Sequence, residues 1–420
     1  MIEVKPAEIK NNIEINVPGS KSYTHRMLIA AALSDGVCVL NNCLRSEDTL
    51  LTQKTLMKLG IQIDDSGDVI EVHGSKGTFQ ALTEPIFLGN SGTSMRLLTP
   101  IVSLGKGAYT LVGSERMHQR PIQDLLDSMN QMGIPAYSVK GNGCPPIEIK
   151  GSRIKGGTIQ LNCKMSSQYL SALLLVAPFS EKTLEIQITE GPVSKPYIDM
   201  TIDVMGKFNV RAESDGYDRF MVEGGQIYKS GRYSVEPDSS QAGYFWAAAA
   251  VTGSTVKVMG VRDSSRQGDV RFADTLGRMG CVLHKQDDGI AVTGGTLSAI
   301  DVDMQDMPDM VPTLAVVAAF AEGTTVIKNV AHLKAKECDR IDAVISELSK
   351  LGVEAVWTDT DLLVKGGWSH GGEIDTYKDH RIAMSFAIAG LKIPGIYIRD
   401  ESCVEKSFPE FWNVFNRMYL

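Results

Sequence analysis

The sequence predicts an α/β fold of two similar domains, each built from three repeated units of helices and strands. Three observations predict this fold: an apolar helix motif that recurs six times, a second helix that follows each copy, and short strand-like runs between the helices. The chain has 420 residues, which is too long for one typical hydrophobic core and indicates two domains.

The first helix of each repeat is a short polar turn followed by an Ala- and Leu-rich segment. Its copies begin about 70 to 74 residues apart, and a fixed period of this kind indicates a repeat architecture. The copies are SYTHRMLIAAAL from Ser22, TSMRLLTPIVSL from Thr93, SQYLSALLLVAPF from Ser167, SSQAGYFWAAAAV from Ser239, DMVPTLAVVAAF from Asp309 and DHRIAMSFAIAG from Asp379. Because these segments are apolar nearly all round, we expect them to be buried, with the strands packed outside them.

The second helix of each repeat is amphipathic and often ends in Leu-Gly or Met-Gly, which fits a glycine in a left-handed C-terminal cap. These helices are expected over residues 48–60, 121–133, 197–208, 269–280, 340–352 and 408–418. Pro121 is predicted at the first helical position, where its missing N–H does no harm.

The predicted strands are β-branched or alternating runs punctuated by glycine. They cover residues 110–112, 147–149, 184–188, 255–258 and 324–327. One repeat is too small to bury a core, so we expect three repeats per domain. A first strand over residues 2–15 precedes the first repeat and is expected to pair with the other half. We therefore expect a discontinuous domain of residues 1–17 and 236–420 and an inserted domain of residues 18–235.

Composition limits the function. The formal net charge is -8, which argues against a nucleic-acid or membrane-surface binder, so any anion site must be a local basic cluster. The seven cysteines include no C-x-x-C pair, which is typical of reduced thiols. No basic segment followed by an apolar run marks a signal peptide, and the apolar runs are too short to cross a bilayer. These features predict a cytoplasmic protein. The histidines show no metal-ligand spacing, and no dinucleotide fingerprint is present.

Charged and small residues gather where the repeat helices begin. Helix N-termini offer free N–H groups and a positive dipole end, and small residues let the backbone approach a ligand. Such residues occur at 18–26, 89–96, 116–121, 166–168, 194–197, 309, 336–340, 379–381 and 406–409. Taken singly, each motif also has an ordinary reading as a loop, an N-cap or a surface ion pair. Their common place in successive repeats favours one site for two or more phosphate or carboxylate groups.

In this order and spacing the motifs resemble the 5-enolpyruvylshikimate-3-phosphate (EPSP) synthase family of enolpyruvyl transferases, nearly end to end. The motifs that carry the resemblance are P-G-S-K-S from Pro18, G-N-S-G-T-S-M-R from Gly89, R-P-I from Arg120, S-S-Q from Ser166, S-K-P-Y from Ser194, P-D from Pro308, K-E-C-D-R from Lys336, D-H-R from Asp379 and K-S-F-P from Lys406. The resemblance implies two domains of three β-α-β-α-β-β units with buried parallel helices, an inside-out α/β barrel. It also implies transfer of the enolpyruvyl group of phosphoenolpyruvate to the 5-hydroxyl of shikimate 3-phosphate without a metal or organic cofactor.

The resemblance implies roles for individual residues. The residues expected to bind shikimate 3-phosphate are Lys21, Ser22, Arg26, Ser166, Ser167, Gln168, Ser194, Tyr197, Asp309 and Lys336. Those expected to bind phosphoenolpyruvate are Lys21, Gly92, Arg120, Gln168, Arg340, Arg381 and Lys406. The expected catalytic residues are Asp309 as base on the 5-hydroxyl, Glu337 as proton donor to the methylene carbon, and Lys21 and His380 in proton transfer or leaving-group stabilisation. Addition then elimination through a tetrahedral intermediate needs such acid and base groups in a cationic pocket.

The inserted domain is expected to bind mainly shikimate 3-phosphate and the discontinuous domain mainly phosphoenolpyruvate, with the active site in a cleft between them. The partners expected are these two small molecules, with no nucleic acid and no membrane, and the protein is expected to be a monomer. Two residues depart from the family pattern: His332 stands where many members have Asn, and Leu97 where several have Pro. Gly92 keeps the small residue that leaves room for the inhibitor glyphosate, so sensitivity is expected.

Two alternatives remain open. The first is the sister enzyme that transfers enolpyruvyl to UDP-N-acetylglucosamine, whose family carries a reactive Cys where this chain has Glu115. The second is a catalytically inactive anion-binding relative, which would be expected to lack Asp309 or Glu337, and both are present.

Overall fold

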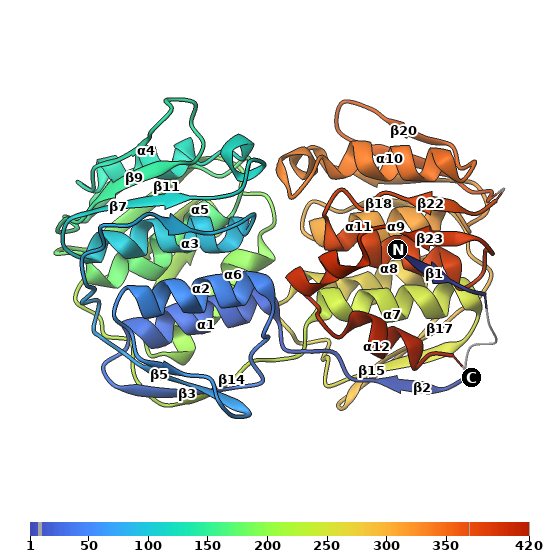
Figure 1. Cartoon of the computed structure of the whole chain (residues 1–420), viewed down its shortest axis with the longest axis horizontal. Helices are drawn as coiled ribbons and strands as arrows, with labels where there is room; N and C mark the ends of the chain where they lie inside the picture. The colour runs from blue at the N-terminus through green and yellow to red at the C-terminus, as the bar shows by residue number, and fades with distance from the viewer. Residues whose placement is uncertain (7–10, 369, 420) are drawn as a thin grey trace. The chain divides into compact units, whose positions relative to one another are not determined.

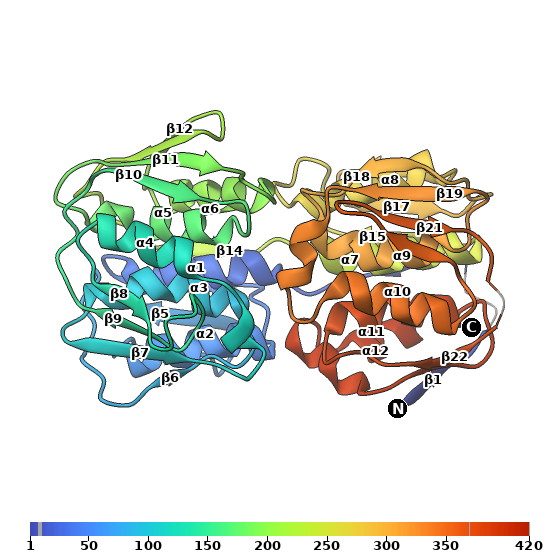
Figure 2. The same cartoon turned by 90° about the horizontal axis from the view of Figure 1, so that it is seen from above.

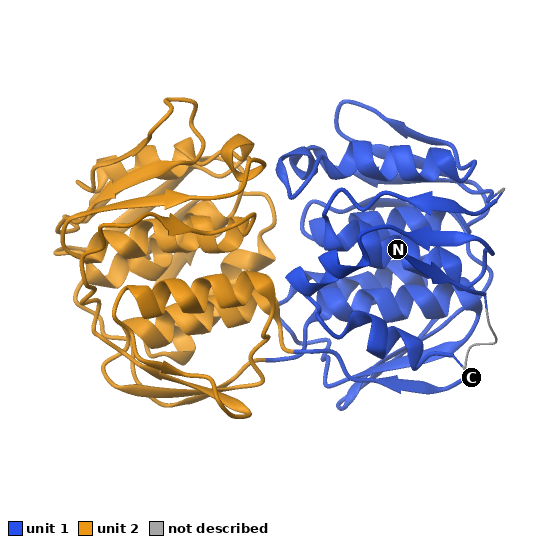
Figure 3. Ribbon diagram, viewed as in Figure 1, with its two compact units in different colours: residues 1–18, 236–420 blue, residues 19–235 orange. Residues whose placement is uncertain are grey.

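The computed structural model describes residues 1–6, 11–368 and 370–419. The chain forms two compact units: unit 1 comprises Met1–Pro18 and Glu236–Leu420, and unit 2 comprises Gly19–Val235 (Figure 3). The chain therefore passes from unit 1 to unit 2 after residue 18 and returns after residue 235. Each unit is described by itself below.

The first helix of every repeat is buried almost completely, as its apolar sequence predicts. In unit 2 these helices are α1 (Lys21–Leu33), α3 (Gly92–Ile101) and α5 (Gln168–Val176), and in unit 1 they are α7 (Ser239–Thr252), α9 (Val311–Ala318) and α11 (His380–Gly390). Every residue of α9 and α11 is buried, and α1 leaves only Ser22 partly exposed. Figures 1 and 2 show these helices running inside each unit with the strands at the periphery.

The second helices are amphipathic and lie nearer the surface. They are α2 (Glu47–Lys58), α4 (Gln123–Gln131), α6 (Pro196–Lys207), α8 (Phe272–Arg278), α10 (Arg340–Lys350) and α12 (Phe411–Asn416). The predicted left-handed glycines follow four of them, at Gly60, Gly133, Gly280 and Gly352.

One of these helices, α6, ends without a glycine, and Asn209 takes the left-handed position after it, with a φ of 63°. Asparagine tolerates this conformation better than other non-glycine residues. The expectation that Pro121 occupies the first position of a helix is wrong, because Pro121 precedes α4 by two residues, whereas Pro196 is the first residue of α6.

Within the described residues, six sheets repeat one strand pattern. In unit 2 the orders are β14-β3-β5-β4, β6-β7-β9-β8 and β10-β11-β13-β12, and in unit 1 they are β2-β15-β17-β16, β18-β19-β21-β20 and β22-β23-β1. The first two strands in each order pair in parallel, and each later pair is antiparallel. The last two strands of each four-stranded order are consecutive in the chain and antiparallel, as expected for the two final strands of a β-α-β-α-β-β unit.

The strand bounds include all five predicted runs. In unit 2 the strands are β3 (Val37–Asn41), β4 (Ile63–Asp64), β5 (Val69–His73), β6 (Ile86–Phe87), β7 (Ala108–Val112), β8 (Ala136–Ser138), β9 (Ile147–Lys150), β10 (Gly157–Asn162), β11 (Leu184–Glu190), β12 (Ala212–Asp215), β13 (Arg219–Val222) and β14 (Arg232–Ser234). In unit 1 they are β1 (Ile2–Val4), β2 (Ile13–Ile15), β15 (Thr255–Met259), β16 (Val282–Gln286), β17 (Gly289–Thr293), β18 (Asp301–Asp303), β19 (Thr324–Lys328), β20 (Ala355–Trp357), β21 (Leu362–Lys365), β22 (Gly372–Ile374) and β23 (Ile396–Ile398).

The N-terminal segment is not one strand over residues 2–15, as predicted from sequence, but contains two separate strands. β1 pairs antiparallel with β23, and β2 pairs in parallel with β15, so both belong to unit 1 (Figure 1, where they are blue among yellow and red elements). Reciprocally, β14 precedes α7 in the chain but pairs in parallel with β3 of unit 2. The expected pairing of the N-terminus with the other half is confirmed, and this exchange of strands makes unit 1 discontinuous.

Each unit holds its own hydrophobic core, formed by the buried helices and the inward faces of its three sheets. In the described part of the chain, no helix is both long enough and apolar enough to span a membrane. The predicted arrangement of two similar α/β domains with buried helices is confirmed.

Candidate active site

The predicted site residues of unit 2 include a buried arginine on the second turn of α1. The guanidinium of Arg26 donates from Nε to Thr201 Oγ1 at 2.7 Å and from Nη1 to the carbonyl of Ser22 at 2.9 Å. Its Nη2 donates to Ser171 Oγ at 3.2 Å and to the carbonyl of Tyr197 at 3.1 Å. Burial lowers the pKa of Arg26 to about 10, so it remains charged at neutral pH. The structure thus brings three predicted residues, Ser22, Arg26 and Tyr197, together.

Lys21 is the first residue of α1 and lies at the helix N-terminus, with Ser20 as its cap. Its Nζ lies 3.5 Å from Asp48 Oδ2, and both side chains are buried. Sequence reasoning did not single out Asp48, which sits in the first turn of α2. A carboxylate there is favoured by the dipole of α2 and balances the charge of the buried ammonium group.

Gly92 begins α3 and faces two guanidinium groups. A Cβ atom at this position would lie 2.4 Å from Arg120 Nη2 and 2.5 Å from Arg96 Nη1. Arg120 donates to the carbonyl of Asn90 at 2.9 Å, and Arg96 donates to Gln168 Oε1 at 3.1 Å. The side chains of Arg96 and Arg120 are both buried. The structure therefore brings the predicted residues Gly92, Arg120 and Gln168 together, and Arg96 joins them.

The predicted serines lie at the starts of α5 and α6. Ser166 Oγ accepts a hydrogen bond from the backbone N–H of Gln168 at 3.2 Å, which satisfies one free donor of α5. Ser167 is buried directly before that helix. Ser194 is buried just before α6 and has a φ of 56°. Non-glycine residues at positive φ are uncommon and often mark functional segments.

Unit 1 contains a buried network of alternating charges. Asp309 lies in η5 (Pro308–Met310), a short 3-10 helix directly before α9. Its Oδ1 contacts Arg340 Nη1 and its Oδ2 contacts Arg381 Nη2, each at 2.8 Å. Arg340 begins α10, and Arg381 is the second residue of α11. One carboxylate thus bridges two guanidinium groups that come from different repeats.

Arg340 also contacts two further carboxylates. Its Nη2 lies 2.9 Å from Glu337 Oε2, and its Nε lies 2.8 Å from Asp379 Oδ2. Burial opposes the charge of Arg340, but Asp379, Glu337 and Asp309 together raise its pKa well above the ordinary value. Asp379 is fully buried and also caps α11, since its Oδ1 accepts from the backbone N–H of Arg381 at 2.8 Å.

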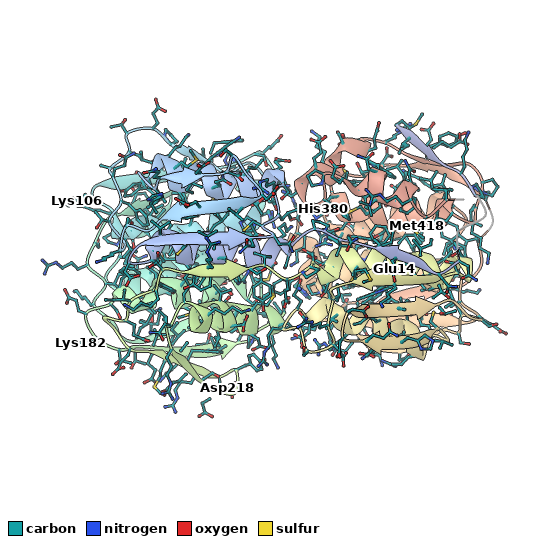
Figure 4. The ribbon with its side chains drawn as sticks, turned by 90° about the horizontal axis from the view of Figure 1, so that it is seen from below. Glu14, Lys106, Lys182, Asp218, His380 and Met418 are labelled. Atoms are coloured by element: carbon teal, nitrogen blue, oxygen red, sulfur yellow. The ribbon has the colours of Figure 1, made fainter. Side chains whose placement is uncertain are left out.

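The remaining predicted residues of unit 1 are His380, Lys336 and Lys406. His380 is fully buried at the start of α11, with Nδ1 3.7 Å from Asp379 Oδ1 (labelled in Figure 4). Lys336 follows η6 (Ala331–Ala335), and Lys406 ends η7 (Glu401–Lys406) in a buried position. Burial and the nearby charge of Lys336 lower the pKa of His332 to about 3, so its imidazole is neutral. The departure from Asn at this position therefore adds no positive charge.

The arrangement suits anion binding and proton transfer rather than redox or nucleophilic chemistry through a thiol. Guanidinium groups bind phosphate and carboxylate through paired hydrogen bonds. Burial raises the pKa of the Cys338 thiol well above its ordinary value, so that thiol is un-ionised. Among residues 1–6, 11–368 and 370–419, no three His, Cys, Asp or Glu side chains are grouped to hold a metal ion.

Four residues of these clusters were not predicted: Asp48, Arg96, Asp379 and Tyr244, whose Oη accepts a hydrogen bond from Arg381 Nη1 at 3.0 Å. Arg96 and Asp379 lie inside motifs that the sequence singles out, G-N-S-G-T-S-M-R and D-H-R, so their position was a usable signal. Asp48 and Tyr244 carry no comparable local signal, because each acts through a partner distant in sequence.

Comparisons with known proteins give one consistent result. The model of the family described as EPSP synthase (3-phosphoshikimate 1-carboxyvinyltransferase) matches residues 6–415. The chain is 41% identical to the 3-phosphoshikimate 1-carboxyvinyltransferase of Syntrophobacter fumaroxidans over 409 residues, or 96% of each chain. It is 41% identical to the protein of that name from Shewanella piezotolerans over 99% of each chain. Its structure is similar to EPSP synthase from Acinetobacter baumannii, with a TM-score of 0.82 at 28% identity over 100% of this chain and 98% of that one.

Proposed function

Because this chain belongs to the EPSP synthase (3-phosphoshikimate 1-carboxyvinyltransferase) family, we propose that it transfers the enolpyruvyl group of phosphoenolpyruvate to the 5-hydroxyl of shikimate 3-phosphate and releases phosphate. The reaction belongs to the shikimate pathway. The family match and the names of the relatives both support this activity.

The observation that carries the proposal within the structure is the bridge from Asp309 to Arg340 and Arg381, at 2.8 Å to each guanidinium. Two buried arginines supply the positive charge that phosphoenolpyruvate, with its phosphate and carboxylate, requires. The same contacts hold a carboxylate beside them, in a position suited to a general base.

We propose that substrate binding exchanges these ion pairs. An anionic group of phosphoenolpyruvate competes with Asp309 for Arg340 and Arg381. A carboxylate released from two guanidinium groups is a stronger base, because a nearby positive charge favours its ionised form. Asp309 then takes the proton of the 5-hydroxyl as the oxygen attacks the carbon that bears the phosphate.

Glu337 is proposed as the donor that protonates the methylene carbon of phosphoenolpyruvate. Its carboxylate lies 2.9 Å from Arg340 Nη2, so one arginine contacts both the proposed base and the proposed acid. When an anionic group of phosphoenolpyruvate takes Arg340, the charge that opposes protonation of Glu337 is removed, and Glu337 can take up the proton that it donates. Lys21 and His380 are proposed to assist proton transfer or to stabilise the departing phosphate. In the elimination step the bond between this carbon and the phosphate oxygen breaks, Glu337 takes a proton back from the methyl group, and the double bond of the enol ether forms.

In unit 2, the residues proposed for shikimate 3-phosphate lie at the starts of the helices: Lys21, Ser22, Arg26, Ser166, Ser167, Gln168, Ser194 and Tyr197. In unit 1, Asp309 and Lys336 are proposed to complete the set. Phosphoenolpyruvate is proposed to contact mainly Arg340, Arg381 and Lys406 in unit 1 and Lys21, Gly92, Arg120 and Gln168 in unit 2. Helix N-termini and arginine side chains are the groups that suit oxyanions.

The deciding assay measures phosphate release from phosphoenolpyruvate in the presence and absence of shikimate 3-phosphate. Release that depends on shikimate 3-phosphate is expected. Release that depends instead on UDP-N-acetylglucosamine would replace the proposal with the sister activity. That alternative is disfavoured by the family match and by Glu115, which stands where the sister family has its reactive Cys.

No release with either acceptor would favour the inactive anion-binding relative, although Asp309 and Glu337 are present and both contact Arg340. We also propose that the protein acts as a cytoplasmic monomer. Size-exclusion chromatography with light scattering tests the monomer, and a mass near twice 45.7 kDa would contradict it.

A further inference from the structure

A buried carboxyl group lies behind the charge network of unit 1 and has no part in the function proposed above. Asp269 belongs to η4 (Gly268–Arg271), the short helix before α8, and its side chain is only 3% exposed. Its Oδ2 makes a short hydrogen bond with Ser240 Oγ in the first turn of α7. Within the described residues, Asp269 Oδ1 has no hydrogen-bond partner.

One face of α7 connects this carboxyl group to the network. Ser240 and Tyr244 are four residues apart and therefore lie on the same side of the helix. Tyr244 Oη accepts a hydrogen bond from Arg381 Nη1 at 3.0 Å, and Arg381 Nη2 contacts Asp309 at 2.8 Å. Arg381 Nε is buried and, like Asp269 Oδ1, has no hydrogen-bond partner among the described residues.

The charges around Asp269 come from several elements. They are Asp238, the cap of α7, Asp309 of η5 and Arg381 of α11. Burial is the largest cause that raises the pKa of Asp269, the charges of Asp309 and Asp238 add to the rise, Ser240 and Arg381 oppose it, and the resulting pKa is about 7. An unpaired buried carboxylate beside other carboxylates is costly, so such a group retains its proton.

We propose that Asp269 is a positioning residue that sets how strongly Arg381 binds the anionic substrate. As a neutral acid, Asp269 leaves the charge of Arg381 to Asp309 and to phosphoenolpyruvate. As a carboxylate, it competes for the same guanidinium and adds a negative charge behind the anion site. This inference rests on the proposed function and deepens it. It makes the affinity for phosphoenolpyruvate depend on the proton of Asp269, a residue that is not among those proposed to contact the substrate.

The direction of the effect follows from the charges. Loss of the proton from Asp269 weakens anion binding, so KM for phosphoenolpyruvate should rise as pH increases through neutrality. A coupling of about one pKa unit between ligand and proton corresponds to about a tenfold change in KM. By reciprocity, binding of phosphoenolpyruvate should favour the protonated form.

The test compares KM and kcat of the wild type with those of Asp269→Asn at saturating shikimate 3-phosphate, over a range of about pH 6 to 8.5 around the raised pKa. The neutral amide imitates the protonated acid. The ratio of the wild-type KM to the Asp269→Asn KM should rise about tenfold with an inflection near neutrality. Taking the ratio cancels the ionisation of phosphoenolpyruvate itself. A ratio that stays flat across the range overturns the inference.

Two further variants make the test specific. Asp263→Asn removes an exposed carboxylate that pairs with Lys285 at 2.6 Å, and it should keep the wild-type pH dependence. Ser240→Ala removes a hydrogen bond that lowers the pKa of Asp269, so it should move the inflection to higher pH. An unmoved inflection in Ser240→Ala contradicts the inference even where Asp269→Asn does not fold. Wild-type turnover with a flat ratio overturns only this inference, whereas absence of wild-type turnover overturns the proposed function.

Discussion

Substitution of Gly92 by alanine tests how closely the two guanidinium groups of unit 2 approach the start of α3. The added Cβ would lie 2.4 Å from Arg120 Nη2, 2.5 Å from Arg96 Nη1 and 2.8 Å from Arg120 Cζ. Carbon and nitrogen atoms in van der Waals contact lie about 3.5 Å apart, so each guanidinium must move by about 1 Å. The φ of Gly92 is not in the left-handed region, so the effect is steric rather than conformational.

The expected magnitude follows from the hydrogen bonds that hold these guanidinium groups. Arg120 donates to the carbonyl of Asn90 at 2.9 Å, and Arg96 donates to Gln168 at 3.1 Å and to the carbonyl of Pro121 at 3.2 Å. A hydrogen bond that involves a charged group contributes about 1.5 to 3 kcal/mol. Loss of one such contact to phosphoenolpyruvate would raise KM by about tenfold to a hundredfold. We expect a smaller effect on kcat, because the substitution leaves Asp309 and Glu337, the proposed base and acid, unchanged.

The assay is steady-state phosphate release with phosphoenolpyruvate varied and shikimate 3-phosphate saturating. The matched control is Gly206→Ala, because Gly206 is exposed within α6 and nothing lies within 4 Å of its added Cβ. This control should leave KM unchanged and stabilise the protein by about 0.5 to 1 kcal/mol, since glycine weakens helix interiors. A wild-type KM in Gly92→Ala would refute the reasoning, because it would mean that Arg120 can move without loss of substrate contact.

Four further outcomes are expected. Glu337→Gln should lower kcat by about a hundredfold or more while calorimetry shows nearly unchanged substrate affinity, since proton donation contributes about 10² to 10⁴; near-normal kcat would remove Glu337 from its role. Arg26→Ala should weaken calorimetric binding of shikimate 3-phosphate and also lower the melting temperature, because Arg26 ties α1 to α5 and α6 through Ser171, Thr201 and Tyr197; unchanged binding would reject its assignment. Glyphosate should inhibit the wild type and inhibit Gly92→Ala less; insensitivity of the wild type at millimolar concentration would contradict the first expectation. Asp269 has a raised pKa of about 7, so the folded chain binds its proton more tightly than the unfolded chain does. The free energy of unfolding should therefore fall, by at most about 4 kcal/mol, as the pH rises from about 4 to about 7. Urea titrations should show that Asp269→Asn removes this slope, and an equal slope in both proteins would contradict it.

The fold was predictable because the same apolar helix segment recurs along the sequence. An apolar helix about every 70 residues can only be buried, and the strands must then cover it. The exchange of β2 and β14 between the repeats was predictable only in part. A three-residue strand such as Ile13–Ile15 has too few side chains to specify its partner, so its pairing with β15 depends on the fold as a whole.

The site was predictable at its positive residues and less so at its negative ones. Lys21 and Arg340 are the first residues of α1 and α10, and Arg120 lies between η2 (Met117–Gln119) and α4, so the repeat makes their positions conspicuous. Asp48 faces Lys21 and Asp379 faces Arg340. The D-H-R motif marks the position of Asp379, but neither pairing can be read from the sequence. The same limit applies to Gly92, whose need for a missing Cβ is set by Arg96 and Arg120 and becomes measurable only in three dimensions.

The paired negative residues change how the site is understood. A cluster of bare cations in a protein of net charge -8 would repel itself, whereas Asp48, Asp309, Asp379 and Glu337 hold Lys21, Arg340 and Arg381 in ion pairs. Breaking a buried ion pair is costly unless the freed charge finds a new partner. An anionic substrate that takes Arg340 and Arg381 supplies that partner and leaves Asp309 free to accept a proton. Under this reasoning the base becomes strong only when phosphoenolpyruvate is bound, which would limit the reaction to the complete complex.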